Sequence, residues 1–187
     1  TLRNSSAASD VYKRQAKLVA VSKTRSTKEI NDAYNSGQKI FGENRVQEIV
    51  EKQKLLPDDI EWHMIGHLQK NKVKYITNFI SLIHSLDRIS LAKEIDKYAK
   101  KSNREIDCLI QLKISSEETK FGLDINHLEN FYSEVKEYNN INLVGLMGMA
   151  SFTQEKEKII DEFNKIKELY DKMKLKNSNL KILSTGM

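Results

Sequence analysis

The stretch LVAVSKTRSTKEI, residues 18–30, joins a short apolar run to a helix start and places a lysine between them. Residues 18–22 are apolar or small, as expected for a strand buried within a sheet. Ser26 is a good helix N-cap, Glu29 completes a capping box three residues later, and Gly37 is suited to ending the helix. The stretch therefore predicts a strand, a lysine (Lys23) at its tip and an amphipathic helix.

Similar apolar runs recur along the chain and are rich in Val, Ile and Leu. Most are separated by stretches whose apolar residues have helical spacing, such as Val46, Ile49 and Val50. The runs begin at residues 18, 39, 61, 81, 107, 142 and 181. Strands and helices in alternation predict a parallel α/β sheet.

Two closures of such a sheet compete. An open doubly wound sheet usually has a glycine-rich phosphate turn after its first strand, whereas this chain has SKTRST there. Polar residues instead follow the ends of several runs, among them Lys23, Asn44, His84 and Ser184, which is typical of a (β/α)8 barrel. We predict an incomplete (β/α)8 TIM-type barrel of about seven strands, without the eighth strand. Residues 1–16 have no apolar period and are expected to be a disordered leader outside the barrel domain, residues 17–187.

Composition limits the class of protein. The chain has 187 residues, 39% hydrophobic and 30% charged, which indicates one soluble globular domain, and no apolar run approaches the roughly 18 residues of a membrane span. One cysteine, Cys108, excludes an internal disulfide and fits the cytoplasm, and the four histidines form no recognised metal motif. The net charge is +5, but acidic residues are mixed among the lysines, so we expect no nucleic-acid binding.

Lys23 raises a chemical question, because a lysine at a barrel strand tip points into the mouth of the barrel. Apolar walls there would disfavour the ammonium and leave a neutral amine, which can form a Schiff base with an aldehyde such as pyridoxal 5'-phosphate (PLP). Position alone favours a simpler alternative, in which the lysine reaches from the strand end into solvent.

Several longer motifs occur in one order at barrel spacing and together resemble the PLP homeostasis protein family, the YggS/PROSC group. The resemblance covers residues 17–187 and implies a barrel like that of alanine racemase, without the second domain of that enzyme. The motifs are AVSKT with Lys23, FGENRVQE from Phe41, WHMIGHLQKNK from Trp62, HSLD from His84, KFGL from Lys120 and GLMGMA from Gly145.

The resemblance implies a PLP-binding homeostasis protein that holds its cofactor as a Schiff base on Lys23. Such a protein is expected to be a non-catalytic cytoplasmic carrier or regulator of vitamin B6 and amino-acid balance, a monomer, with PLP and PLP-dependent apoenzymes as its partners and no membrane attachment. The alternative is a PLP-dependent enzyme of the alanine-racemase type. That chemistry needs a second acid/base, usually a tyrosine, and the tyrosines here fall on helix-like stretches.

Most of the implied cofactor-binding residues also have a structural alternative, and none is expected to be catalytic or to bind metal. Asn44 either contacts the cofactor or caps the following helix. His63 and His84 either line the cofactor or are hydrogen-bonded core histidines, and barrel packing is favoured for Met147. Lys120 either attracts an anionic ligand or is a solvated loop lysine. The implied set is Lys23, Asn44, Ser184 and Gly186, with His63, His84 and Met147 as further candidates.

The end of the chain, STGM, resembles the family's S-M-G-M-S, with Thr185 in place of the commoner methionine. The resemblance implies an eighth-strand segment that carries an arginine toward the pyridine nitrogen and glycines toward the phosphate. We therefore expect a C-terminally incomplete copy with weakened PLP affinity, in which Ser184 and Gly186 are the nearest remaining pocket residues. Its open edges, residues 17–22 and 181–184, would invite pairing with another chain.

Overall fold

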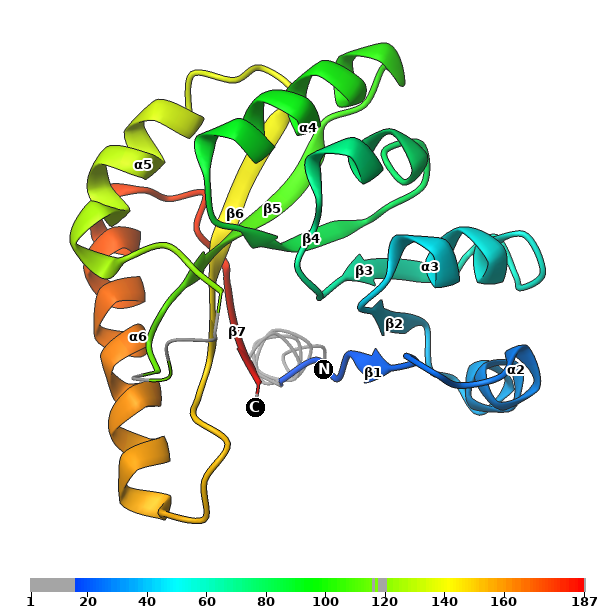
Figure 1. Ribbon diagram of the computed structural model, residues 1–187, viewed down its shortest axis with the longest axis horizontal. Helices are drawn as coiled ribbons and strands as arrows, with labels where there is room; N and C mark the ends of the chain where they lie inside the picture. Colours follow the sequence, from blue (N-terminus) through cyan, green and yellow to red (C-terminus); the bar gives the residue numbers. More distant parts are fainter. Residues whose placement is uncertain (1–15, 116, 118–120, 187) are drawn as a thin grey trace, which may run out of the picture.

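Parallel strands in chain order build the protein around one curved sheet. The computed structural model describes residues 16–115, 117 and 121–186. Each described strand pairs with its neighbours in the sequence, so β1 and β7 form the two edges. The seven strands are β1 Ala20–Val21, β2 Ile40–Glu43, β3 Glu61–Met64, β4 Leu82–Leu86, β5 Ile106–Leu112, β6 Ile141–Met149 and β7 Ile182–Gly186. The sheet curls with its helices outside (Figure 1), which confirms the predicted incomplete barrel of alternating strands and helices.

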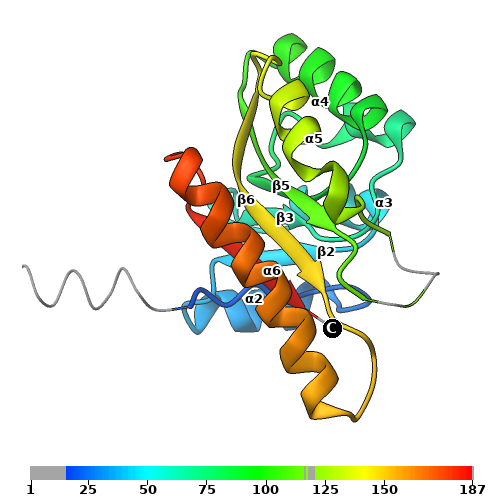
Figure 2. The ribbon, with the colours of Figure 1, turned by 90° about the vertical axis from the view of Figure 1, so that its left-hand side faces the viewer.

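The helices cover the outer face of this sheet, and α6 runs across β6 and β7 (Figure 2). They are α2 Thr27–Asn35, α3 Val46–Gln53, α4 Ile89–Lys101, α5 Leu128–Val135 and α6 Lys156–Lys176. Two 3-10 helices, η1 Lys70–Tyr75 and η2 Ile125–His127, were not indicated by the sequence pattern, because turns this short give no helical period. Among the described helices none is long and apolar enough to span a bilayer.

Helix α2 begins as the sequence predicts. The Ser26 hydroxyl accepts from the Glu29 N–H, and the Glu29 carboxylate accepts from the Ser26 N–H, which completes the capping box. After the helix, Gly37 adopts a φ of +100° and donates its N–H to the Tyr34 carbonyl. The first turn of α2 is therefore fixed directly behind the loop that carries Lys23.

Two separate apolar clusters lie on the two faces of the sheet. The larger one packs strands against helices and includes the fully buried Phe41, Trp62 and Ile83. The smaller one consists of strand residues alone: Leu82, Leu109, Val144 and Met147, with Met149 packed against it. Because side chains alternate along a strand, Leu82 and His84 share the inner face of β4. The barrel interior therefore combines this apolar cluster with the polar side chain of His84.

Close approach of β7 to β6 depends on a glycine. A Cβ atom at Gly145 would lie only 1.8 Å from the carbonyl oxygen of Ile182, its partner in the β6–β7 register. The same register sets Met147 beside Ser184, so the position of the β7 tip follows from this contact.

We expect Gly145→Ala to force β7 away from β6 and to lower the free energy of unfolding by about 1–3 kcal/mol, the usual cost of overpacking. Gly186→Ala is the matched control, because nothing lies within 4 Å of a Cβ at that position. Chemical denaturation of the two variants measures the difference. Equal losses in both would show that the Ile182 contact is not the cause.

Candidate functional site at the barrel mouth

Three of the residues singled out in the sequence meet inside the barrel. His84 on β4 lies between two partners, with its Nε2 3.0 Å from His63 Nδ1 on β3 and its Nδ1 3.0 Å from Ser184 Oγ on β7. Strands β4 and β7 are not neighbours in the sheet, so this chain of hydrogen bonds crosses the interior. His84 therefore ties the β7 tip to the middle of the barrel.

Both histidines are held in the neutral form. Burial lowers the pKa of His84 to about 3, with the His63 ring adding to the effect, and burial and the charge of Lys17 lower the pKa of His63 to about 4. A neutral imidazole has one donor and one acceptor nitrogen, so the chain His63–His84–Ser184 can run in a single direction with each bond satisfied. The arrangement fits hydrogen-bonded core histidines and leaves Ser184 oriented at the β7 tip.

The histidine pair should make stability fall in mild acid. Because the folded pKa values lie below the ordinary value of 6.5, the unfolded chain takes up these protons first. We expect the free energy of unfolding to fall by about 1–2 kcal/mol per histidine between pH 7 and 5, above the range where carboxylates titrate. His84→Gln should flatten this slope even though it lowers stability overall. Denaturation curves at both pH values test this, and an unchanged slope in the variant would contradict it.

Lys23 lies in the turn after β1, and its placement departs from one expectation. The side chain is exposed rather than enclosed by apolar walls, because β1 is a two-residue edge strand whose own Val21 is 52% exposed. Among the described residues the Lys23 amine has no hydrogen bond or ion pair. An amine that is accessible and not bound to a carboxylate is open to an incoming electrophile.

The turn around Lys23 is anchored by residues that the sequence analysis did not single out. Ser22 Oγ donates to Glu43 Oε1 at 2.8 Å, and Lys52 Nζ donates to the Ser22 carbonyl at 2.8 Å and to Glu43 Oε1 at 2.5 Å. On the other side of Lys23, the Thr24 N–H donates to Glu48 Oε2 at 3.0 Å. The spacing of Glu48 and Lys52, four residues apart on a helix, was the available signal.

Asn44 follows β2, and one of its two interpretations is wrong. Helix α3 begins at Val46 with Arg45 as its N-cap, so Asn44 does not cap it. The Asn44 backbone instead lies against Gly66, where a Cβ would come within 2.4 Å of the Asn44 carbonyl oxygen. The ends of β2 and β3 are thus pressed together, and contact of the Asn44 side chain with a ligand stays a prediction.

The remaining candidates differ in surroundings. Met147 is 5% exposed and packs in the inner apolar cluster, whereas Gly186 at the end of β7 faces open space. Lys120 and Met187 lie outside the described residues. Cys108 is buried, and burial raises the pKa of its thiol, as expected for an inert core cysteine. Among the described residues no three His, Cys, Asp or Glu side chains are grouped to bind a metal.

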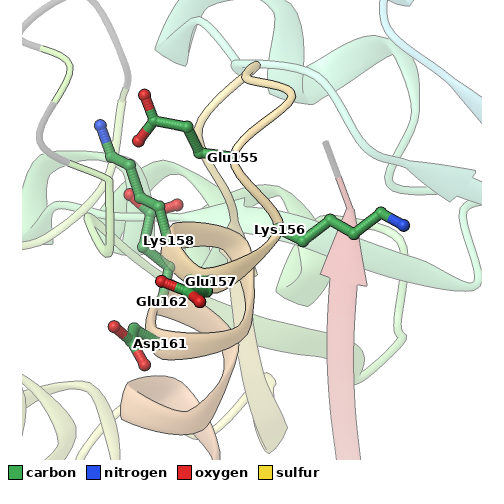
Figure 3. Close-up of a pocket in the computed structure, with 6 residues that line it drawn as sticks. All are labelled: Glu155, Lys156, Glu157, Lys158, Asp161 and Glu162. Atoms are coloured by element: carbon green, nitrogen blue, oxygen red, sulfur yellow. The ribbon is translucent and has the colours of Figure 1, made fainter.

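A surface hollow at the start of α6 contains none of these residues (Figure 3). It is lined by Glu155, Lys156, Glu157, Lys158, Asp161 and Glu162. Figure 3 shows the Lys156 side chain directed away from the carboxylates of the others. Carboxylates already occupy this helix N-terminus and would repel an anion, so we assign no phosphate site there.

Comparison with known proteins places the chain in a family. The model of the alanine racemase N-terminal domain matches residues 2–187. A pyridoxal phosphate homeostasis protein of Aquifex aeolicus is 43% identical over 174 residues, which cover 92% of this chain and 76% of that protein. This chain belongs to the pyridoxal phosphate homeostasis protein family. A member from Helicobacter pylori (strain ATCC 700392 / 26695) is 36% identical over 91% of this chain and 77% of its own.

Solved structures agree with the fold of this homeostasis protein family. PipY of Synechococcus elongatus PCC7942 without PLP superposes with a TM-score of 0.83 at 25% identity, covering 96% of this chain and 95% of that one. The structure of PipY with PLP bound gives 0.79 at 24% identity, with the same coverage. An alanine racemase of Clostridium difficile 630 gives 0.67 at 16% identity, covering 92% of this chain and 46% of that one, so it shares the fold of the barrel.

Proposed function

We propose that this protein is a PLP-binding homeostasis protein that attaches the cofactor at Lys23 and performs no turnover of its own. The observation that carries the proposal is the Lys23 amine, which lies exposed and unpaired among the described residues at the tip of β1. It sits in the family motif AVSKT. The PLP bound in PipY, a protein of the same fold, supports the choice of ligand.

The residues at the barrel mouth fit such a ligand. Gly186 leaves open space at the end of β7, and Ser184 beside it presents a hydroxyl whose orientation His84 fixes. When bound, PLP supplies an electrophilic aldehyde carbon. Lys23 is proposed to hold PLP at this point, because its amine would be the group that forms a Schiff base with such a carbon. We propose that Asn44 contacts the cofactor from the end of β2. The interior wall of the site would be formed by Met147 and the two neutral histidines, His63 and His84.

A carrier or regulator is favoured over an enzyme by the placement of the tyrosines. Alanine racemase chemistry needs a second proton donor and acceptor opposite the lysine. The described tyrosines lie on helices or in the connection after α5, and none lies at the C-terminal end of a described strand. We propose that the protein acts as a cytoplasmic monomer and delivers PLP to PLP-dependent apoenzymes, with effects on vitamin B6 and amino-acid balance.

Trapping the adduct tests this function. The purified protein is incubated with PLP, reduced with borohydride, and digested for peptide mass spectrometry. We expect one dominant pyridoxyl-lysine, at Lys23. In the control, PLP is first reduced with borohydride to the alcohol, which cannot form an imine. Every lysine should then stay unmodified. Label scattered over surface lysines would contradict the proposal, and racemisation of alanine on addition of PLP would favour the enzyme alternative.

A further inference from the structure

The residue after Lys23 has a strained backbone. Thr24 adopts a φ of +63°, in the left-handed region that a β-branched residue rarely enters. Such a conformation persists only where surrounding contacts impose it, and it is concentrated at functional sites. The contacts that hold Thr24 in this conformation therefore bear on the function of its neighbour, Lys23.

Three of the hydrogen bonds in this turn lie at Thr24 or span it. The Thr24 N–H donates to Glu48 Oε2 at 3.0 Å, the Thr24 hydroxyl donates to the Lys23 carbonyl at 2.6 Å, and the Arg25 N–H donates to the Ser22 carbonyl at 3.0 Å. The first bond is the one that Thr24 makes with a charged side chain outside the turn. Because charge-assisted hydrogen bonds are the stronger ones, Glu48 is the main external restraint on Thr24.

The Glu48 carboxylate is itself held in place by Lys52. Lys52 lies one helical turn later, 3.2 Å from the Glu48 carboxylate, and its amine also contacts Glu43 Oε1 and the Ser22 carbonyl. The side chains of Glu43 and Lys52 are 0% and 10% exposed. This acid–base–acid cluster, Glu43, Lys52 and Glu48, therefore reaches both sides of Lys23, through Ser22 and through Thr24, and leaves the lysine side chain free.

We propose that Glu48 is a positioning residue for Lys23: its carboxylate, braced by Lys52 against Glu43, fixes the turn so that the amine is presented at the barrel mouth. The inference rests on the proposed function, in which Lys23 is the attachment point. The cluster contacts the turn at Ser22, through Glu43 and Lys52, and at Thr24, through Glu48. Glu48 acts on the backbone beside Lys23, and this role is separate from a general contribution to stability.

The loop after β1 offers a matched pair of variants. At each end of it a carboxylate accepts a backbone N–H, so each carboxylate can be removed while the other stays. Glu48 accepts from Thr24, and Glu29 accepts from Ser26. Each also pairs with a basic residue four positions away, Lys52 and Arg25 respectively. Glu48→Ala should accelerate hydrogen exchange of the Thr24 amide, measured by NMR, by at least about tenfold, which corresponds to the free energy of one charge-assisted hydrogen bond. The exchange rate of the Ser26 amide should stay unchanged. Glu29→Ala should do the reverse.

The second readout follows Lys23 itself. In Glu48→Ala we expect the rate of borohydride-trapped labelling of Lys23 by PLP to fall by roughly tenfold and the circular dichroism of the bound chromophore per mole to shrink, because the amine is no longer held in one place. Glu29→Ala should match the parent protein in both. Glu48→Gln keeps an oxygen that can accept from Thr24 but loses the charge, so it should restore part of the rate.

The outcomes separate the two proposals. If Thr24 exchange is unchanged in folded Glu48→Ala, or if exchange rises while Lys23 labelling and dichroism stay at parent values, the positioning role is wrong. If exchange rises as expected but the parent protein itself forms no adduct at Lys23, the restraint on the turn stands, and it is the PLP attachment that fails. Equal loss of labelling in Glu29→Ala would also overturn the role of Glu48.

Discussion

Lys23→Ala is expected to abolish the borohydride-trapped PLP adduct while leaving the fold intact. The amine makes no hydrogen bond or ion pair among the described residues, so its removal takes away no contact that supports the barrel. We expect the free energy of unfolding to change by less than about 0.5 kcal/mol, as for other surface substitutions. Labelling followed by peptide mass spectrometry and a denaturation curve measure the two effects.

Two further variants sharpen this result. Lys23→Arg should also form no adduct, because a guanidinium stays protonated and cannot form the imine. Lys28→Ala removes another exposed lysine, on the adjoining helix α2, and should label like the parent protein. Adduct formation that survives in Lys23→Ala would mean that another lysine is the attachment point. An adduct lost equally in Lys28→Ala would mean that labelling reports general surface charge.

The strand and helix pattern carried most of the information about the fold. Apolar runs bounded by polar tips predicted the seven strands, and Ser26 with Glu29 predicted the start of α2, because these signals depend on residues close in the sequence. Lys23 is exposed, as the solvent alternative predicted, and the enclosure by apolar walls failed for a tertiary reason. A strand tip is enclosed only if strands flank it on both sides, and β1 has one described neighbour, β2.

The candidate site was predicted in part. His84 and Ser184 were placed at strand ends and His63 in the run that begins at residue 61, but their mutual hydrogen bonds depend on the curvature that brings β7 opposite β4. Sequence position alone cannot specify that curvature. The interpretation of Asn44 as an N-cap failed because α3 starts one residue later than that interpretation requires, a shift within the usual uncertainty of helix ends.

The charged cluster beside Lys23 was missed because its parts lie on different elements. Glu43 ends a strand and Lys52 lies on the following helix, so their pairing depends on how α3 packs against β2. In the sequence both read as ordinary members of a chain in which 30% of residues are charged. Only the fold distinguishes this buried pair from the exposed ones.

Lys52→Met is expected to lower the free energy of unfolding by about 3–5 kcal/mol, the usual cost of leaving a buried charge without its partner. Glu43 is fully buried, and one of its carboxylate oxygens, Oε2, has no hydrogen-bond partner. Without Lys52 the whole charge would depend on the Ser22 hydroxyl at Oε1. Chemical denaturation measures the loss, and Lys39→Met, which breaks the exposed pair with Asp59, should change stability little.

A double variant separates the burial of charge from the loss of packing. In Lys52→Met/Glu43→Leu both charges are gone and apolar groups of similar size remain, so we expect most of the lost stability to return. The Ser22 and Thr24 contacts to the cluster would not return with it. A double variant as unstable as Lys52→Met alone would show that the Lys52 side chain stabilises the barrel by its packing and its bond to the Ser22 carbonyl. Recovery of stability together with slow labelling of Lys23 would mean that the charges are kept for the turn they hold and not for the stability of the barrel.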